Sequence, residues 1–543
     1  MSSTHNKSFS KQYNMGEDSW TKVEDIQPIF AKVFETFQSG KTRPLAWRRE
    51  QLYRFGEMIQ ENETALCEAV TADLARPHTE TLISELSLFK HEINLNVKNL
   101  EKWNKEEKVA TDLMWKATNP KVRKEPKGVG LVIGTWNYPI SLLLVPVIGA
   151  ITAGCTCIIK PSELAPVTAA LIARLLPQYL DSSAYAVILG GIEQTSELLQ
   201  NAKDIDHATS FASPRIRFDH IFYTGSTRIG KVVAHAAADM LCTSTLELGG
   251  KSPAVVLDGL SDSVLEVVAK RVAWGKWINA GQVCIAPDYI LTTPSTSARL
   301  IPAIKRNLAT FSASSSDKTP ASSLSTPDYS RIISPGHYSR LCKLLDQTKG
   351  KVVYGGGRDD DTRGLEVTVV EGVDGEDSLM SEELFGPILP VVTLPDRDVM
   401  ASFIKARETP LALYVFSQKA ADVEYFLHNV PSGTFLHNDC IMQFIIPNLP
   451  FGGRGGSGWG TYHGKATFDA FTSLRPHAST PIWMDLAMKA NYPPYTPQNL
   501  RMLLLIIGST VRRPRKFGLG LLLKTIGVLI GVLAVVKGGL KGQ

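Results

Sequence analysis

The feature that most constrains the fold is a series of short apolar runs, each followed by a helical segment, that begins near Gly128. The runs lie at 130–134, 156–159, 184–189 and 221–223. A strand–helix series of this kind predicts an α/β fold, with a parallel sheet covered by helices on both faces. Ligands of such sheets bind at the carboxyl ends of the strands.

Around this series the chain has helical and loop-like segments. Residues 20–115 have the apolar spacing of amphipathic helices, and a second strand–helix series starts near Ser252. Segment 201–216 separates a helix from its following strand, and the Ser-rich segment 311–327 is predicted to be a surface loop. At 543 residues the chain is too long for one small core, so we expect two or three domains.

The net charge of +5 is concentrated at one end of the chain. Residues 501–543 contain eight basic and no acidic residues, so residues 1–500 carry a net charge of −3. A net negative charge on residues 1–500 does not predict a basic surface for nucleic acid, so we expect no nucleic-acid partner.

The seven cysteines are scattered and odd in number, which favours a reducing compartment over a disulfide framework. Cys155 and Cys157 lie in an apolar run and lack zinc-site spacing, so they are predicted to be strand core. Residues 1–20 are polar, without the apolar region of a secretory signal, and are expected to be disordered.

Two fragments indicate covalent catalysis by a thiol. Glu247 opens an E-L-G-G sequence at a predicted strand end, and Cys284 lies in a glycine-flanked loop further along the chain. A cysteine and a carboxylate in these settings suit a thiol nucleophile followed by a water-activating base. Either fragment alone is weak, because E-L-G-G can be a turn and most lone cysteines are inert core residues.

Asn137 lies in a T-W-N-Y-P turn directly after a predicted strand. It can be a simple turn former, since asparagine tolerates turn conformations. Alternatively, its side-chain amide donates to a developing oxyanion, an interaction worth about 3 kcal/mol of barrier per donor.

The nucleotide signal is incomplete. Segment 225–231 (G-S-T-R-I-G-K) nearly matches a phosphate-binding P-loop, but Val232 stands where Ser or Thr would ligate magnesium. What remains is a strand that enters a helix through Gly225, Ser226 and Gly230, which is either a pyrophosphate site or a plain turn. Lys160 and Glu163 end a neighbouring strand, where a glutamate can bind both ribose hydroxyls of NAD.

Together these stretches resemble the aldehyde dehydrogenases, specifically the class 3 or fatty aldehyde dehydrogenase branch, from about residue 25 to about 480. The stretches that carry the resemblance are G-T-W-N-Y-P (134–139), I-I-K-P-S-E (158–163), F-Y-T-G-S-T (222–227), E-L-G-G-K-S-P (247–253), N-A-G-Q-V-C-I-A-P-D-Y (279–289), E-E-L-F-G-P (382–387) and L-P-F-G-G-R-G-G-S-G-W-G-T-Y-H-G-K (449–465). The resemblance implies Cys284 as nucleophile, Glu247 as general base and Asn137 in the oxyanion hole. It also places Glu383 and Phe385 at the nicotinamide end of NAD, with NADP as the alternative cofactor.

The resemblance further implies a Rossmann-type cofactor domain, an α/β catalytic domain and a small bridging, oligomerisation sheet, in a homodimer. The expected boundaries are 21–248 for the NAD-binding domain (with part of the bridging element near 115–128), 249–430 for the catalytic domain, 431–480 for the bridging segment, 481–511 for a linker and 512–543 for a membrane-anchoring tail. The insertion at 201–216 departs from the family pattern.

The tail has the length of a membrane helix. Residues 517–536 are mostly apolar, but Lys524 sits near their middle, where a charge costs about 3 kcal/mol on insertion scales. The tail is expected either to span a bilayer or to lie in its interface, and the alternative is an amphipathic helix docked on the body or on a partner. The basic residues at 512–516 outweigh those that follow, so the catalytic body is expected on the cytosolic side of the endoplasmic reticulum or another intracellular membrane.

The leading hypothesis is NAD-dependent oxidation of long-chain aldehydes to acids through a cysteine thiohemiacetal and a thioester, without a metal. The alternative is the same chemistry on another lipophilic aldehyde, such as an apocarotenal or an aromatic aldehyde. A non-enzymatic binding or structural protein is disfavoured because Cys284, Glu247 and Asn137 are all present. An acyl-phosphate-forming enzyme is disfavoured by the water-activating role of Glu247.

Overall fold

The computed structural model describes residues 19–200, 215–313 and 322–507. The predicted N-terminal segment, most of the insertion at 201–216 and the predicted membrane tail therefore lie outside the described residues. Within these ranges no helix is long and apolar enough to cross a membrane. The chain divides into one compact unit of residues 1–107 and 122–476 and a second of residues 108–121 and 477–543.

The first sheet of the large unit has six strands in the order β17-β7-β6-β3-β4-β5. Its strands are β3 (Val129–Ile133), β4 (Thr156–Lys160), β5 (Tyr185–Val187), β6 (His220–Thr224), β7 (Thr243–Glu247) and β17 (Gly458–Trp459). All neighbours are parallel except β17, which runs antiparallel to β7. The predicted parallel strands are confirmed, whereas the two-residue β17 was not predicted, because a Gly-rich segment carries no strand pattern.

Helices cover both faces of this sheet, as predicted. Alternate residues of a strand point to opposite faces, and Val132, Ile159 and Phe222 belong to one core while Leu131, Ile158 and Ile221 belong to the other. The first core includes residues of α3 (Leu45–Glu61), α4 (Glu63–Leu74), α6 (Ser87–Asn104), α7 (Ser141–Ala153) and α8 (Pro166–Tyr179). The second includes residues of α2 (Val23–Gln38), α9 (Ile192–Gln200) and α10 (Thr227–Asp239).

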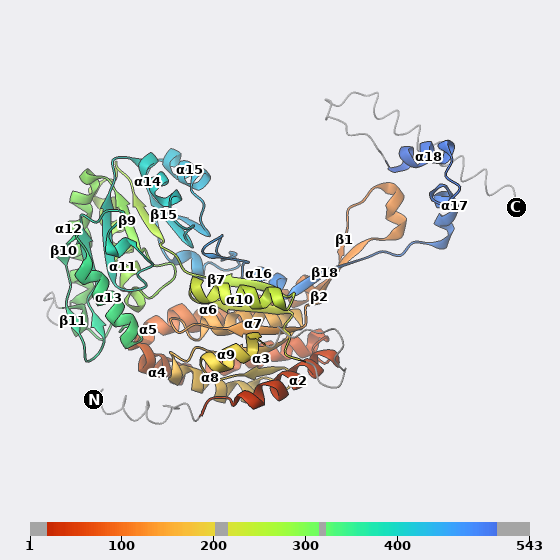
Figure 1. Cartoon of the computed structure of the whole chain (residues 1–543), viewed down its shortest axis with the longest axis horizontal. Coiled ribbons are helices and arrows are strands. Elements are labelled where there is room, and N and C mark those ends of the chain that lie inside the picture. The colour runs from red at the N-terminus through yellow and green to blue at the C-terminus, as the bar shows by residue number, and fades with distance from the viewer. Residues whose placement is uncertain (1–18, 201–214, 314–321, 508–543) are drawn as a thin grey trace. The chain divides into compact units, whose positions relative to one another are not determined.

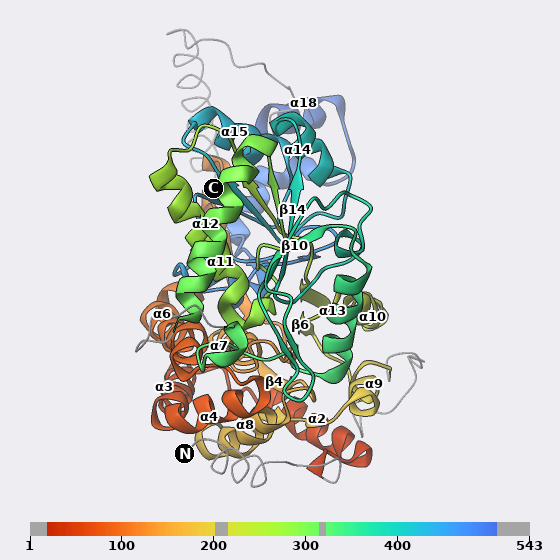
Figure 2. The same ribbon diagram turned by 90° about the vertical axis from the view of Figure 1, so that its left-hand side faces the viewer.

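The second sheet has seven strands in the order β10-β13-β14-β9-β8-β15-β16. They are β8 (Pro253–Val256), β9 (Tyr289–Thr292), β10 (Lys351–Tyr354), β13 (Thr368–Glu371), β14 (Ile388–Thr393), β15 (Ala412–Phe416) and β16 (Thr434–His437). Only β10 is antiparallel to its neighbour. Its helices are α11 (Asp262–Trp277), α12 (Pro294–Ser312), α13 (Pro335–Gln347), α14 (Arg397–Lys405) and α15 (Ala420–Asn429). Figures 1 and 2 show this sheet and the first one in separate lobes.

A third, three-stranded sheet has the order β1-β2-β18 and joins the segments predicted as bridging elements. Its strands are β1 (Glu107–Lys108), β2 (Lys121–Pro126) and β18 (Thr472–His477). The predicted linker contains the short helices η8 (Ile482–Met484), α17 (Asp485–Met488) and η9 (Lys489–Asn491) and the longer α18 (Pro497–Ile507). The proposed domain boundaries stay a prediction.

The predicted surface loop at 311–327 starts too early, and its residues 314–321 lie outside the described residues. Residues 311 and 312 complete α12, and Ser323–Ser325 form a 3-10 turn, η5, in which Ser323 is buried. The turn starts because the Ser322 hydroxyl accepts a hydrogen bond from the Leu324 backbone N–H at 3.1 Å. Serine therefore acts here as a capping residue rather than as a sign of a loop.

Candidate active site

Cys284 follows a strained turn at the end of α11. Asn279, Ala280 and Gly281 have φ values of 48°, 50° and 70°, so three consecutive residues lie in the left-handed region. Each non-glycine residue there costs about 1–2 kcal/mol. Gly281 has no alternative, because a Cβ at this position would lie 2.4 Å from the carbonyl oxygen of Gly386. The thiol loop is thus pressed against the E-E-L-F-G-P loop.

The thiol of Cys284 is half-buried. Burial raises its pKa above the usual range, and the nearby carboxylates of Glu383 and Glu247 raise it further. Backbone N–H groups of Cys284 and Ile285 act in the opposite direction but do not reverse the shift. Because only the thiolate is nucleophilic, the thiol must lose its proton as it reacts.

Glu247 is the last residue of β7 and is 4% exposed. Among the described residues neither of its carboxylate oxygens has a hydrogen-bond partner, and burial raises its pKa well above the usual range. The neighbouring strand β17 places Gly458 opposite Glu247. Glycine is required there, since a Cβ would lie 1.9 Å from the Leu246 carbonyl oxygen.

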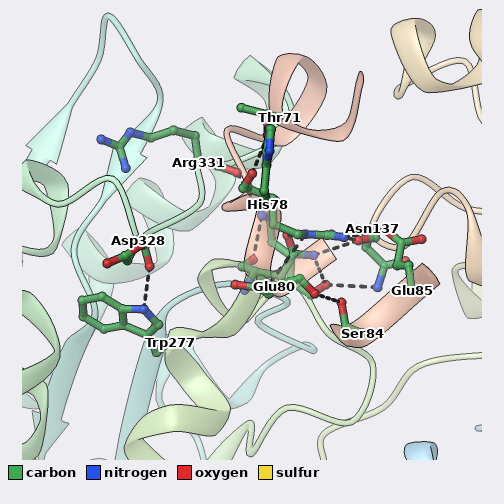
Figure 3. A network of polar contacts seen from close by, with 12 residues as sticks. Thr71, His78, Glu80, Ser84, Glu85, Asn137, Trp277, Asp328 and Arg331 are labelled. Atoms are coloured by element: carbon green, nitrogen blue, oxygen red, sulfur yellow. Dashed lines mark hydrogen bonds and ion pairs between the residues drawn. The ribbon is translucent and has the colours of Figure 1, made fainter. Parts of the chain in front are cut away.

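Asn137 lies between β3 and α7, and its side chain reaches the thiol loop. Its Nδ2 donates to the backbone oxygen of Gln282 at 3.0 Å, two residues before Cys284. An amide nitrogen has two N–H groups, so this bond fixes the side chain and leaves one donor. Figure 3 shows Asn137 next to Glu85, in a network of polar contacts.

Glu383 and Phe385 join the same site from the loop before β14. A Cβ at Gly249 would lie 2.1 Å from Glu383 Oε2, so the E-L-G-G sequence needs a glycine to admit this carboxylate. Burial raises the pKa of Glu383 to about 8. The ring of Phe385 packs edge-on against Trp136, with centroids 5.3 Å apart, and so contacts the turn that holds Asn137.

The predicted ribose-binding residues follow β4 in the first sheet. Lys160 ends β4 and is buried, and its Nζ donates to the Pro161 carbonyl oxygen at 2.9 Å and lies 3.9 Å from Glu163 Oε2. Burial lowers the pKa of Lys160. The Glu163 side chain is 40% exposed and lines a small pocket with Trp20, Leu189 and Gly190 among others. An accessible carboxylate at the sheet edge has the chemistry to accept hydrogen bonds from ribose hydroxyls.

Gly225, Ser226 and Gly230 form the turn from β6 into α10. The Ser226 hydroxyl caps the helix by accepting from the Ile229 backbone N–H at 3.4 Å. A Cβ at Gly230 would lie 2.6 Å from a methyl carbon of Leu248, so this glycine lets α10 pack closely on the end of β7. The turn is compatible with a plain strand–helix connection, because Gly230 is needed for packing. It is equally compatible with a pyrophosphate site, because a helix N-terminus can bind a phosphate.

Two charged clusters next to the site were missed from the sequence. Buried Arg76 contacts Glu80 and Glu85, and Figure 3 shows Glu85 beside Asn137. Lys276, Asp288 and Lys251 form the second cluster: the two lysine Nζ atoms lie 3.9 and 2.5 Å from Asp288. The available sequence signals were Lys276 between apolar residues and the positions of Lys251 and Asp288 inside the motif stretches quoted above. In the ranges that the structure describes, no three His, Cys, Asp or Glu side chains cluster as metal ligands would.

Comparison with known proteins identifies the family. The model of the "Aldehyde dehydrogenase family" matches residues 8–476. Mouse "Aldehyde dehydrogenase family 3 member B2" is 41% identical over 475 residues, or 88% of this chain and 94% of the relative. "Aldehyde dehydrogenase family 3 member A2" of Macaca fascicularis is 40% identical over 503 residues, 92% and 98% of the two chains.

A solved structure agrees with these sequence relatives. The "Substrate bound state of Staphylococcus Aureus AldH" superposes with a TM-score of 0.81 at 36% identity, and covers 89% of this chain and 99% of that one. Because one family model spans most of the chain and the fold agrees, the chain belongs to the aldehyde dehydrogenase family and is an oxidoreductase that acts on aldehydes with NAD(P).

Proposed function

We propose that the protein oxidises long-chain aldehydes to carboxylic acids with NAD, through a thiohemiacetal and a thioester on Cys284. The observation that carries this proposal is the approach of three distant segments. The thiol loop, the buried carboxylate of Glu247 and the amide of Asn137 come together although they are far apart in the sequence. This set suits a nucleophile, a base and an oxyanion donor.

In the first half-reaction the Cys284 thiol releases its proton to solvent, and the sulfur bonds to the aldehyde carbon. The aldehyde oxygen becomes an oxyanion, which accepts hydrogen bonds from Asn137 Nδ2 and from the Cys284 backbone N–H. The Gln282 carbonyl oxygen keeps the Asn137 amide in place. NAD, held by Glu163 and by the turn of Gly225, Ser226 and Gly230, would accept the hydride that leaves the former aldehyde carbon as the thioester forms.

In the second half-reaction Glu247 takes a proton from water, and the water oxygen attacks the thioester carbon. The C–S bond breaks, the acid leaves, and the sulfur recovers a proton. The surroundings of Glu247 support this role, since burial raises its pKa and so makes its carboxylate a stronger base than an exposed glutamate. Both oxygens are free of protein hydrogen bonds within the described part of the chain.

The residues proposed for the cofactor have chemistry that fits a dinucleotide. Glu163 would accept hydrogen bonds from the adenosine ribose beside Lys160, and would repel a 2′-phosphate, which favours NAD over NADP. The turn of Gly225, Ser226 and Gly230 would face the pyrophosphate. Glu383 and Phe385 would flank the nicotinamide end, in agreement with their contacts with Gly249 and Trp136.

The preference for a lipophilic substrate rests on the apolar, basic C-terminal tail. A tail of that composition would attach the enzyme to an intracellular membrane such as the endoplasmic reticulum, with the catalytic body in the cytosol. Long-chain aldehydes are dissolved in the lipid of such a membrane, so the attached enzyme would lie next to its substrate. We further propose a homodimer. Two sheet ends support it: β16 ends the seven-stranded sheet, and β18 ends the three-stranded sheet and carries Leu474, which is 67% exposed.

The test is NADH formation by the full-length protein in detergent, measured against a panel of short, long-chain, aromatic and apocarotenoid aldehydes. The highest kcat/KM is expected on long saturated aldehydes. A clear preference for aromatic or apocarotenoid aldehydes would select the alternative substrate class. Reduction of NADP at the same rate would refute the proposed role of Glu163.

A further inference from the structure

Arg76 is a fully buried arginine whose guanidinium connects three segments of the site. It lies between α4 and the short helix α5 (His78–Thr81), and its side chain is 0% exposed. Nη1 donates to Glu85 Oε1 at 2.6 Å, Nε donates to Asn279 Oδ1 at 3.1 Å, and Nη2 donates to the carbonyl oxygen of Asn137. One planar group therefore contacts the helical segment, the strained thiol turn and the oxyanion turn.

The two carboxylates beside Arg76 extend the same connection. Glu85 Oε2 accepts hydrogen bonds from the backbone N–H groups of Ile140 and Ser141 at 2.8 and 2.9 Å, where α7 begins. Glu80 Oε1 accepts from the backbone N–H of Asn279 at 2.8 Å and lies 3.6 Å from Arg76 Nε. Each carboxylate thus holds one of the two turns by its backbone, and Arg76 contacts both carboxylates.

The turn held in this way is the strained one. Asn279 and Ala280 adopt left-handed backbone angles that residues other than glycine avoid. Such angles persist only when the surrounding structure over-determines them. Asn279 is fixed from three sides, by Glu80 at its N–H, by Arg76 at its side-chain oxygen, and by its own Nδ2, which donates to the Asn137 carbonyl oxygen at 2.9 Å.

We propose that Arg76 is the positioning residue of this active site: it fixes the thiol loop to the Asn137 turn, and so sets the spacing between the Cys284 sulfur and the oxyanion donor. The effect on oxyanion formation rests on the proposed function. The claim that Arg76 sets the environment of the thiol does not depend on that function. Lysine cannot replace arginine, because an ammonium lacks the planar fork that reaches three acceptors in fixed directions.

The experiment compares Arg76→Lys and Arg76→Ala with wild type for kcat, for KM of NAD and for the rate at which iodoacetamide alkylates Cys284. Misplacing reacting groups by about 1 Å costs about 100-fold in rate, and a loss of that size in kcat is expected, with KM for NAD within about twofold. The alkylation rate should change as well. Guanidinium, added to Arg76→Ala at concentrations that do not unfold the protein, should recover part of kcat by entering the vacated site.

The matched control is Arg48→Ala. Arg48 is also a buried arginine that donates to backbone and side-chain oxygens, those of Thr42 and Asn104, but it does not contact the thiol loop. Its loss should lower the unfolding temperature and leave kcat of the folded enzyme near wild type, with no effect of guanidinium. Should Arg76→Ala fail to fold, Arg76→Lys, which keeps the charge opposite Glu85, gives the same comparison.

The inference is overturned if both Arg76 variants keep wild-type kcat and alkylation rate. It is also overturned if kcat of the Arg76 variants falls only in proportion to their loss of stability, as expected for the Arg48 control, and added guanidinium restores no kcat. A wild-type protein that oxidised no aldehyde would refute the proposed function alone, because the alkylation rate of Cys284 would still report whether Arg76 positions the thiol.

Discussion

Glu247→Gln separates the two halves of the proposed reaction. The amide has the shape of the carboxylate, and no protein hydrogen bond among the described residues is lost, because neither oxygen of Glu247 makes one there. The fold should therefore persist. Burial raises the pKa of Glu247 above its unfolded value, so wild type loses stability as pH rises through the folded pKa, and the Gln variant does not. The variant should be at least as stable as wild type, above all in alkaline buffer.

The kinetic effect should fall on deacylation. A positioned general base contributes about 100- to 10,000-fold to a rate, or about 3–5 kcal/mol of barrier. The burial of Glu247, at 4% exposure, favours the upper part of this range, because bulk water cannot substitute as base. Rapid mixing with excess NAD and a short aldehyde should give a burst of one NADH per active Cys284, followed by turnover slowed by that factor.

A matched control is Asp73→Asn. Asp73 is another buried carboxylate with a raised pKa, but it accepts hydrogen bonds from the Val167 and Thr168 backbone N–H groups at the start of α8. Its loss should reduce stability and leave the ratio of burst to steady-state rate unchanged. If Glu247→Gln abolishes the burst itself, Glu247 removes the proton from the thiol, and its assignment to deacylation is wrong.

Further outcomes follow from the same site. Cys284→Ala should remove dehydrogenase activity and leave NAD binding, measured by fluorescence, unchanged; residual wild-type turnover contradicts the covalent mechanism. Glu163→Gln should raise KM for NAD and narrow its preference over NADP, and an unchanged preference moves that role to another residue. As pH rises from about 5 to above 7, the unfolding temperature of wild type should fall relative to that of Glu80→Gln, because burial raises the pKa of Glu80 from 4.5 to about 7, a cost of about 3 kcal/mol once ionised; a pH-independent difference between the two proteins contradicts this. Deleting residues 501–543 should release soluble enzyme that keeps its rate on short aldehydes and loses it on long aldehydes in liposomes, and an unchanged membrane fraction refutes the anchor.

The sequence was sufficient for the buried parallel strands of the first sheet, though not for β17, because their burial is two-sided and continuous. Val129–Ile133 and Thr156–Lys160 are fully buried strands, and their apolar runs are short and end at turn residues. The segments at Asn137, Glu247 and Cys284 were likewise found from local residue types at strand ends and loops. Cys155 and Cys157 are both buried and free, and Cys157 lies in β4 as predicted, whereas Cys155 is the residue before that strand.

The remainder of the site depends on contacts between distant residues, which a local pattern does not contain. Arg76 contacts Asn279 across 203 positions, and nothing near either residue in the sequence indicates the other. Gly249 is part of the E-L-G-G sequence that could be a simple turn, whereas its real constraint is the Glu383 carboxylate that fills its Cβ position. Local propensity cannot report a glycine that is required by a neighbour more than a hundred residues away.

The pairing of β17 with β7 has a consequence for synthesis. A chain leaves the ribosome from its N-terminus and domains begin to fold as they emerge, so β7, with Glu247 at its end, is made long before Gly458 and Trp459. Until those residues appear, one edge of the nascent sheet lacks its partner, and an unpaired edge is where strands of separate chains associate. A premature stop before codon 458 would thus yield a polypeptide that contains the nucleophile and the base but has an unpaired, aggregation-prone strand edge at β7. Such a product is expected to be cleared or aggregated rather than to persist as a shorter enzyme.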